Sequence, residues 1–236
     1  MGAPGCLHTS ATTHLFHRLT TYQPITNLRM KFSSFLFTII LFFVACGKDS
    51  SESPERALLT LETAAGNPQT WTWLAKENMF SRNGDNTGYI ANLETGSTKL
   101  LIYLQGGGAC FNSLTCTSNP SSFGENDAQD LINDRQDALL FDRSATSNPF
   151  GDWNYAVVPY STGDVHSGTN NSADVANGPT GQNMTGYNNF TVVIEELKNY
   201  FNANQGITDI ILAGGSAGSF GTYLNFIQTA EAFGSS

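Results

Sequence analysis

Positive charge is scarce in this chain of 236 residues, which has 11 Lys and Arg against 20 Asp and Glu. A chain this acidic binds phosphate backbones poorly, so we expect no nucleic acid partner. Cysteine is scarce too, and four cysteines exclude a small disulfide-dense scaffold. What is present, 40% hydrophobic and only 13% charged residues, suits about one folded domain rather than a disordered chain.

The first 46 residues differ from the others in charge, since they hold three basic residues and no acid. After Cys46 come 8 basic and 20 acidic residues, a formal charge of −12. Within the first part, Met30-Lys31 begins a basic segment, and an apolar run of eleven residues follows at 35–45. That run is too short to span a membrane, which takes about 20 residues, and has the length of a signal-peptide core.

The apolar run ends in Ala45-Cys46, which resembles the cleavage box of a bacterial lipoprotein. We therefore expect 30–46 to be a lipoprotein signal peptide, with Cys46 as the lipid anchor, and 47–65 to be a polar tether. The alternative is an ordinary signal peptide with an incidental cysteine. Residues 1–29 are interpreted as an upstream extension. These features predict a cell-envelope protein, lipid-anchored at the outer membrane or cell surface, or secreted.

After the tether, the pattern predicts an α/β domain over 66–236. Short uninterrupted apolar runs are typical of strands buried on both faces of a parallel sheet. The predicted strands are 88–93, 99–104, 155–159 and 209–213. Helical spacing predicts one helix around 190–201 and a second with an apolar stripe of Phe220, Leu224 and Ile227. Strand and helix in alternation favour a mostly parallel sheet with flanking helices, and 161–188 is predicted to be a long loop.

The fourth predicted strand runs into Gly214-Gly-Ser216-Ala-Gly218, a Gly-x-Ser-x-Gly pattern between a strand and a helix. Such a turn is strained, so the neighbours of the serine must be small. Ser216 would stand exposed at the start of a helix, where N–H groups stabilise developing negative charge. This context predicts a serine nucleophile. The structural alternative is a glycine-rich turn with a helix-capping serine.

A second motif, Gln105-Gly-Gly-Gly-Ala-Cys110, directly follows the strand predicted at 99–104. Three glycines let backbone N–H groups come close to a bound carbonyl, as an oxyanion hole requires. A phosphate-binding loop is the competing interpretation. It is set aside because no Lys-Ser or Lys-Thr follows and the dinucleotide spacing is absent.

Three segments together resemble the pectin acetylesterase and Notum family of serine carboxylesterases. They are the stretch 103–112, the stretch 148–168 with its Val158-Pro-Tyr-Ser-Thr-Gly-Asp164-Val-His166 block, and the Ser216 turn. The resemblance implies an α/β-hydrolase fold without cofactor or metal, and removal of O-acyl groups, O-acetyl above all, from a glycan or protein. It makes Ser216 the nucleophile and the N–H groups of Ala217, Gly107 and Gly108 the oxyanion donors.

The resemblance also assigns Asp164 and His166 to the pocket, as substrate-binding or loop-anchoring residues rather than as triad members. Cys110 and Cys116 are six residues apart, and in an exported protein we expect them to form a disulfide instead of remaining two free thiols. One His and two spaced cysteines offer no ligand set for a metal. The expected partner is an acylated carbohydrate, with the membrane reached through the lipid anchor alone and no obligate protein partner.

The order Ser, Asp or Glu, His is usual for the triad of this fold, yet no histidine follows Ser216 in the sequence. We therefore expect the chain to contain only the N-terminal part of the fold. Two hypotheses follow. The first is a serine esterase whose triad Asp and His lie beyond residue 236. The second is a surface lipoprotein that binds carbohydrate without catalysis, or an inactive fragment.

Overall fold

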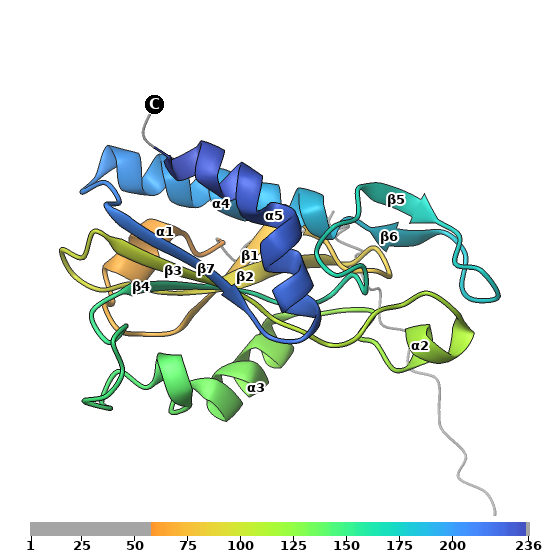
Figure 1. Cartoon of the computed structure of the whole chain (residues 1–236), viewed down its shortest axis with the longest axis horizontal. Helices are drawn as coiled ribbons and strands as arrows, with labels where there is room; N and C mark the ends of the chain where they lie inside the picture. The colour runs from red at the N-terminus through yellow and green to blue at the C-terminus, as the bar shows by residue number, and fades with distance from the viewer. Residues whose placement is uncertain (1–57, 235–236) are drawn as a thin grey trace, which may run out of the picture. The chain divides into compact units, whose positions relative to one another are not determined.

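The computed structural model describes residues 58–234, which all belong to a unit spanning 52–236 (Figure 1). The predicted signal peptide and Cys46 lie outside the described residues. The strands are β1 Thr72–Phe80, β2 Asn86–Asn92, β3 Lys99–Leu104, β4 Asn154–Val158, β5 Asn170–Ala173, β6 Gln182–Met184 and β7 Asp209–Gly214. The helices are α1 Leu61–Ala65, α2 Ser113–Thr117, α3 Glu125–Arg135, η1 Leu139–Phe141, α4 Gly186–Ala203 and α5 Ala217–Phe233.

Five strands form one mixed sheet in the order β1-β2-β4-β3-β7. β3 pairs in parallel with both β4 and β7, whereas β1 and β2 add an antiparallel pair at the β4 side. The predicted α/β class is therefore confirmed, with parallel strands at the centre and at the β7 edge. The register pairs Leu104 with Gly214, so the carboxyl ends of β3 and β7 meet at the same edge of the sheet.

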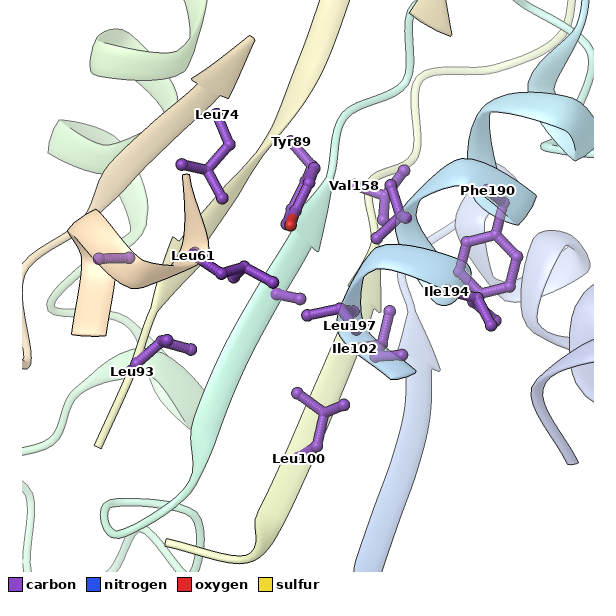
Figure 2. Packing of buried hydrophobic residues seen from close by; sticks show 14 of the residues in the cluster. Leu61, Leu74, Tyr89, Leu93, Leu100, Ile102, Val158, Phe190, Ile194 and Leu197 are labelled. Atoms are coloured by element: carbon purple, nitrogen blue, oxygen red, sulfur yellow. The ribbon is translucent and has the colours of Figure 1, made fainter. Parts of the chain in front are cut away.

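Helices cover both faces of the sheet, with α4 and α5 on one side and α3 on the other (Figure 1). Side chains alternate along β3: Leu100 and Ile102 pack under α4, whereas Leu101 faces the aromatic cluster beneath α3. Figure 2 shows the first of these cores, where Phe190, Ile194 and Leu197 of α4 lie against the sheet. The helical spacing predicted this face of α4 correctly, because the residues that recur at that spacing are all buried: Phe190, Val193, Ile194, Leu197 and Phe201.

Helix α1 lies inside the segment 47–65, which its polar sequence predicted to be a tether. Thr60 caps this helix, and Leu61 and Ala64 are buried in the core shared with α4 (Figure 2). The packed part of the chain thus begins by residue 61 rather than 66. Two apolar residues three apart are too short a pattern to distinguish from a polar linker in the sequence.

Helix α5 packs differently from the sequence prediction. Its buried positions are small or polar, namely Ala217, Gly218, Gly221, Asn225 and Thr229. The predicted stripe of Phe220, Leu224 and Ile227 is instead exposed, together with Tyr223 and Phe226. The small face is required because α5 runs close to the end of β3, where a Cβ at Gly218 would overlap the Leu104 carbonyl. Among residues 58–234, no helix is long and apolar enough to cross a membrane.

Candidate active site

Ser216 occupies a sharp turn between β7 and α5. Its backbone has φ 52° and ψ −118°, a left-handed conformation that is strained for a residue other than glycine. The turn is held by hydrogen bonds from Gly218 N to Gly215 O at 2.8 Å and from Ser219 N to Ser216 O at 2.9 Å. Ser216 is exposed, and its hydroxyl makes no hydrogen bond to any other described residue. This geometry presents the oxygen at the edge of the sheet, as a nucleophile requires.

The glycines around this turn are needed for close approach. A Cβ at Gly106 would overlap the carbonyl oxygen of Gly215 and lie 2.9 Å from the Ser216 Cβ. A Cβ at Gly214 would meet the carbonyl of Leu104 at 3.0 Å. The loop after β3 and the turn after β7 can therefore touch only because Gly106 and Gly214 carry no side chains.

Backbone N–H groups in this contact are unpaired. Gln105 N donates to Val158 O and Cys110 N donates to Gly163 O, so both ends of the glycine loop are fixed. Between them, the N–H groups of Gly107 and Gly108 find no acceptor within 58–234, and neither does Ala217 N at the start of α5. Unpaired donors at a helix N-terminus and in a glycine loop are what an oxyanion hole needs.

A cavity of about 500 Å³ opens beside these groups. Ser216, Gly107 and Gly108 all line it, so the structure brings the predicted nucleophile and two predicted oxyanion donors to one space. Ala217, the third predicted donor, is buried and is not among the described residues that line this cavity. The remaining walls are mostly apolar and come from the strands and from the α3 side of the sheet: Trp71, Ile90, Tyr103, Leu131, Ile132, Phe141 and Val157. Arg135 is the charged residue of the lining.

Cys110 and Cys116 form a disulfide that closes the loop carrying α2. Asn112 caps this short helix, and the guanidinium of Arg82 donates to the carbonyls of Cys116 and Asn119 at 2.9 and 3.0 Å. The end of the glycine loop is thereby tied to the β1–β2 connection. No three His, Cys, Asp or Glu side chains of the described residues lie together as a metal site would need.

Asp164 does not line the cavity. Its carboxylate is instead hydrogen-bonded to neighbouring residues of the same loop and to the start of α4. It accepts hydrogen bonds from the Thr162 hydroxyl at 2.6 Å and from the N–H groups of His166, Gly168 and Gly186, the last at 2.7 Å. Gly186 is the first residue of α4, so Asp164 acts as a cap from a distant loop. This geometry favours the loop-anchoring role and gives no support to direct substrate contact.

His166 is likewise buried, 2% exposed, and absent from the described cavity lining. Its Nε2 lies 2.8 Å from the carbonyl oxygen of Gln105, so the neutral ring donates its proton to the first residue of the glycine loop. The ring also lies 5.1 Å from that of Tyr160. His166 therefore holds the first residue of the glycine loop from a buried position. This geometry gives no support to substrate contact or to a role as base for Ser216.

Acidification is expected to destabilise the protein through His166. Burial lowers the pKa of His166, against opposing effects of the Gln105 carbonyl and the Asp164 charge. The unfolded chain, with an ordinary pKa near 6.5, takes up the proton first, so the free energy of unfolding falls as pH falls below that value. The slope approaches about 1.4 kcal/mol per pH unit. Urea unfolding between pH 5.5 and 7.5 measures it.

The control for this prediction is His166→Gln, whose amide can still donate to the Gln105 carbonyl but does not titrate. The variant should show a shallower loss of stability over the same pH range. Equal slopes in both proteins would mean that His166 carries no proton-linked free energy of folding.

The residues that form the cavity walls were not predicted as site residues from the sequence. Trp71 precedes a strand that the apolar runs did not indicate, and Leu131 and Ile132 lie on α3, a helix that was not predicted. The sequence pattern indicates α3 only weakly, since this helix carries few apolar residues and acidic residues surround them. The aromatic cluster at 71, 141 and 155 is formed by segments far apart in sequence, which spacing cannot reveal.

A serine at positive φ between a parallel strand and a helix, at the same cavity as unpaired N–H groups of a glycine loop, is typical of the α/β-hydrolase fold. Within this fold the family is shown by sequence: residues 71–235 match the model of the Pectinacetylesterase family. The chain belongs to this family of carboxylic ester hydrolases, as the resemblance predicted.

Curated relatives agree with this assignment. The chain is 26% identical over 161 residues to the mouse palmitoleoyl-protein carboxylesterase NOTUM, and 26% identical over 162 residues to the human protein. Each alignment covers 67% of this chain, and the chain spans 31% of the length of either relative. The crystal structure of the Wnt deacylase Notum from Drosophila is similar in fold, with a TM-score of 0.51 and 21% identity over 70% of this chain and 48% of that one.

Proposed function

We propose that this protein acts as a serine carboxylesterase that removes O-acyl groups, O-acetyl among them, from a glycan. The observation that carries the proposal is the meeting of Ser216 with the unpaired N–H groups of Gly107 and Gly108 at one cavity. A lipid anchor at Cys46, as the sequence predicts, would hold the enzyme at the cell envelope. No cofactor is needed for this chemistry.

The reaction would proceed through an acyl-enzyme. The Ser216 hydroxyl oxygen attacks the ester carbonyl carbon, and its proton passes to a general base. The carbonyl oxygen gains negative charge and is stabilised by the N–H groups of Gly107, Gly108 and Ala217. The bond to the alcohol oxygen then breaks, and that oxygen takes up the proton. Water hydrolyses the acyl-enzyme and releases the carboxylic acid.

The general base is not among the described residues that line the cavity. His166, the histidine of the described residues, is held by the Gln105 carbonyl. This observation favours a second candidate function, carbohydrate binding without catalysis. The two are separated by measuring acetate release from acetylated glycans and p-nitrophenyl acetate, alongside calorimetric titration of the same glycans. Binding without release would support the second function and contradict the first.

The cavity walls bear on the acyl group. A two-carbon acyl group fills a small part of about 500 Å³, whereas the apolar walls suit a longer chain. If the acyl chain enters this cavity, each added methylene should contribute about 0.8 kcal/mol, or about fourfold in kcat/KM. A series of p-nitrophenyl esters from acetate to decanoate tests this. A flat or falling series would favour acetyl as the acyl group.

The esterase proposal fails if the full chain hydrolyses none of these esters and no acyl adduct appears on Ser216 by mass spectrometry. Slow hydrolysis would still be consistent with the proposal. Binding and an oxyanion hole alone are known to leave about 10³–10⁴-fold acceleration over water when the triad is incomplete.

A further inference from the structure

Tyr160 packs directly on the glycine loop. Its side chain is buried, 1% exposed, and a Cβ at Gly107 would lie only 2.7 Å from the Tyr160 ring. The Tyr160 hydroxyl lies 2.7 Å from the carbonyl oxygen of Gly108. The N–H of Val165 lies 3.0 Å from the same hydroxyl. The phenol oxygen thus bridges two backbone segments at the middle of the loop.

The direction of these hydrogen bonds follows from the donors available. Val165 N–H can only donate, so the Tyr160 oxygen accepts there and its single proton is directed to the Gly108 carbonyl. Burial raises the pKa of Tyr160 to about 12, so the hydroxyl keeps that proton at any pH of interest. The Tyr160 hydroxyl therefore remains a donor to the Gly108 carbonyl, and this hydrogen bond does not change with pH.

The middle of the loop needs such a contact because its backbone is otherwise free. Three successive glycines, with Gly108 at φ 87°, can rotate their peptide planes at little cost. In a trans peptide the C=O and the following N–H point in opposite directions. Holding the Gly108 carbonyl toward Tyr160 therefore fixes the Gly108–Ala109 peptide and limits how the adjoining Gly107–Gly108 peptide, which carries the Gly108 N–H, can turn.

The two ends of the loop are held by other groups. Gln105 is fixed by His166 at its carbonyl and by Tyr160 N–H at its side-chain oxygen, 3.0 Å away. Cys110 is fixed by its N–H to Gly163 O and by the disulfide. Removing the Tyr160 hydroxyl alone would leave both ends in place and release only the central peptides.

We propose that Tyr160 is a positioning residue for the oxyanion hole: its hydroxyl holds the Gly108–Ala109 peptide and thereby keeps the adjoining Gly107–Gly108 peptide in the orientation in which the Gly108 N–H can stabilise negative charge. This inference rests on the proposed esterase function, because it assumes that the loop binds an anion. It goes beyond that function by assigning the preorganisation of the loop to one side chain that does not line the cavity.

The test compares an anionic with a neutral ligand of the same apolar length. Octanoate and octanol are titrated into the full chain by calorimetry, for the unchanged protein and for Tyr160→Phe. We expect the unchanged protein to bind octanoate more tightly than octanol, and Tyr160→Phe to lose at least tenfold in octanoate affinity while octanol affinity changes less than twofold. A merely structural loss would weaken both ligands together. In ester hydrolysis, kcat should fall with KM little changed.

The matched control is Tyr155→Phe. This tyrosine is also buried, and its hydroxyl lies 2.8 and 2.7 Å from two backbone carbonyls, those of Leu140 and Phe150, that share its one proton, but it has no hydrogen bond to the loop. The variant should keep the preference for octanoate. If Tyr160→Phe keeps it as well, the positioning role is wrong while the proposed function stands. If the unchanged protein shows no preference for octanoate, the loop is not anion-receptive, and both the esterase proposal and this inference are overturned.

Discussion

Replacing Ser216 by Ala is expected to lower kcat/KM for ester hydrolysis by at least about 10³-fold, because the acyl-enzyme can no longer form. The free energy of unfolding should change by less than about 0.5 kcal/mol. The Ser216 hydroxyl is exposed and bonded to no described residue, so its removal leaves no buried group unpaired. The measurements are hydrolysis of p-nitrophenyl esters and urea unfolding.

The control for this substitution is Ser172→Ala, which deletes the same hydroxyl from an exposed position on β5. Its kcat/KM should stay within about twofold of the unchanged protein, as for most surface changes. Equal hydrolysis by the Ser216→Ala and Ser172→Ala variants would show that any activity comes from another site. The esterase proposal would then lose its central residue.

The parts of the fold that could be predicted from the sequence are those in which burial follows a regular local pattern. Strand 99–104 was predicted with its observed bounds, since a strand covered on both faces reads as a continuous apolar run. The apolar face of α4 was also correct, because its spacing is regular over about three turns. Both signals are local and belong to single elements.

The parts that could not be predicted depend on contacts between elements. Strand β1 has mixed burial and contains Lys76 and Glu77, so its pattern resembles an exposed loop. The predicted loop 161–188 contains the short hairpin of β5 and β6, whose strands are polar and mostly unburied. For α5, large apolar residues indicated the wrong face, because close approach to β3 selects glycine and alanine instead.

At the candidate site, the sequence indicated Ser216 and the glycine loop, and the family resemblance indicated Asp164 and His166, but neither indicated the contact of Tyr160 with the loop. Ser216 and the glycine loop carry a short motif whose backbone geometry demands glycine. The supporting contacts of Tyr160, Asp164 and His166 are hydrogen bonds to backbone groups, which leave no spacing rule in the sequence. Local motifs thus indicate the candidate residues, and the three-dimensional structure is needed to show which side chains hold them in place.

Gly106→Ala is expected to damage both stability and turnover. The new Cβ would overlap the Gly215 carbonyl and press on Ser216 and on the nitrogen of Ala217, 3.1 Å away, so backbone on one side must move. Overpacking of this kind costs about 3 kcal/mol, the upper end of the usual range. If the loop moves instead, the oxyanion donors are displaced, and a shift of about 1 Å can cost about 10²-fold in rate.

Gly66→Ala separates this steric effect from the general effect of replacing glycine. Gly66 has φ −67° in the right-handed region, and the nearest atoms to its added Cβ lie at an ordinary 3.5 Å. Restricting the unfolded chain at such a position stabilises by about 0.5 kcal/mol. The two glycine-to-alanine changes should therefore alter the free energy of unfolding in opposite directions. If Gly106→Ala is as stable as Gly66→Ala and keeps full turnover, the glycine loop and the serine turn are not in contact, and the oxyanion hole described above does not form.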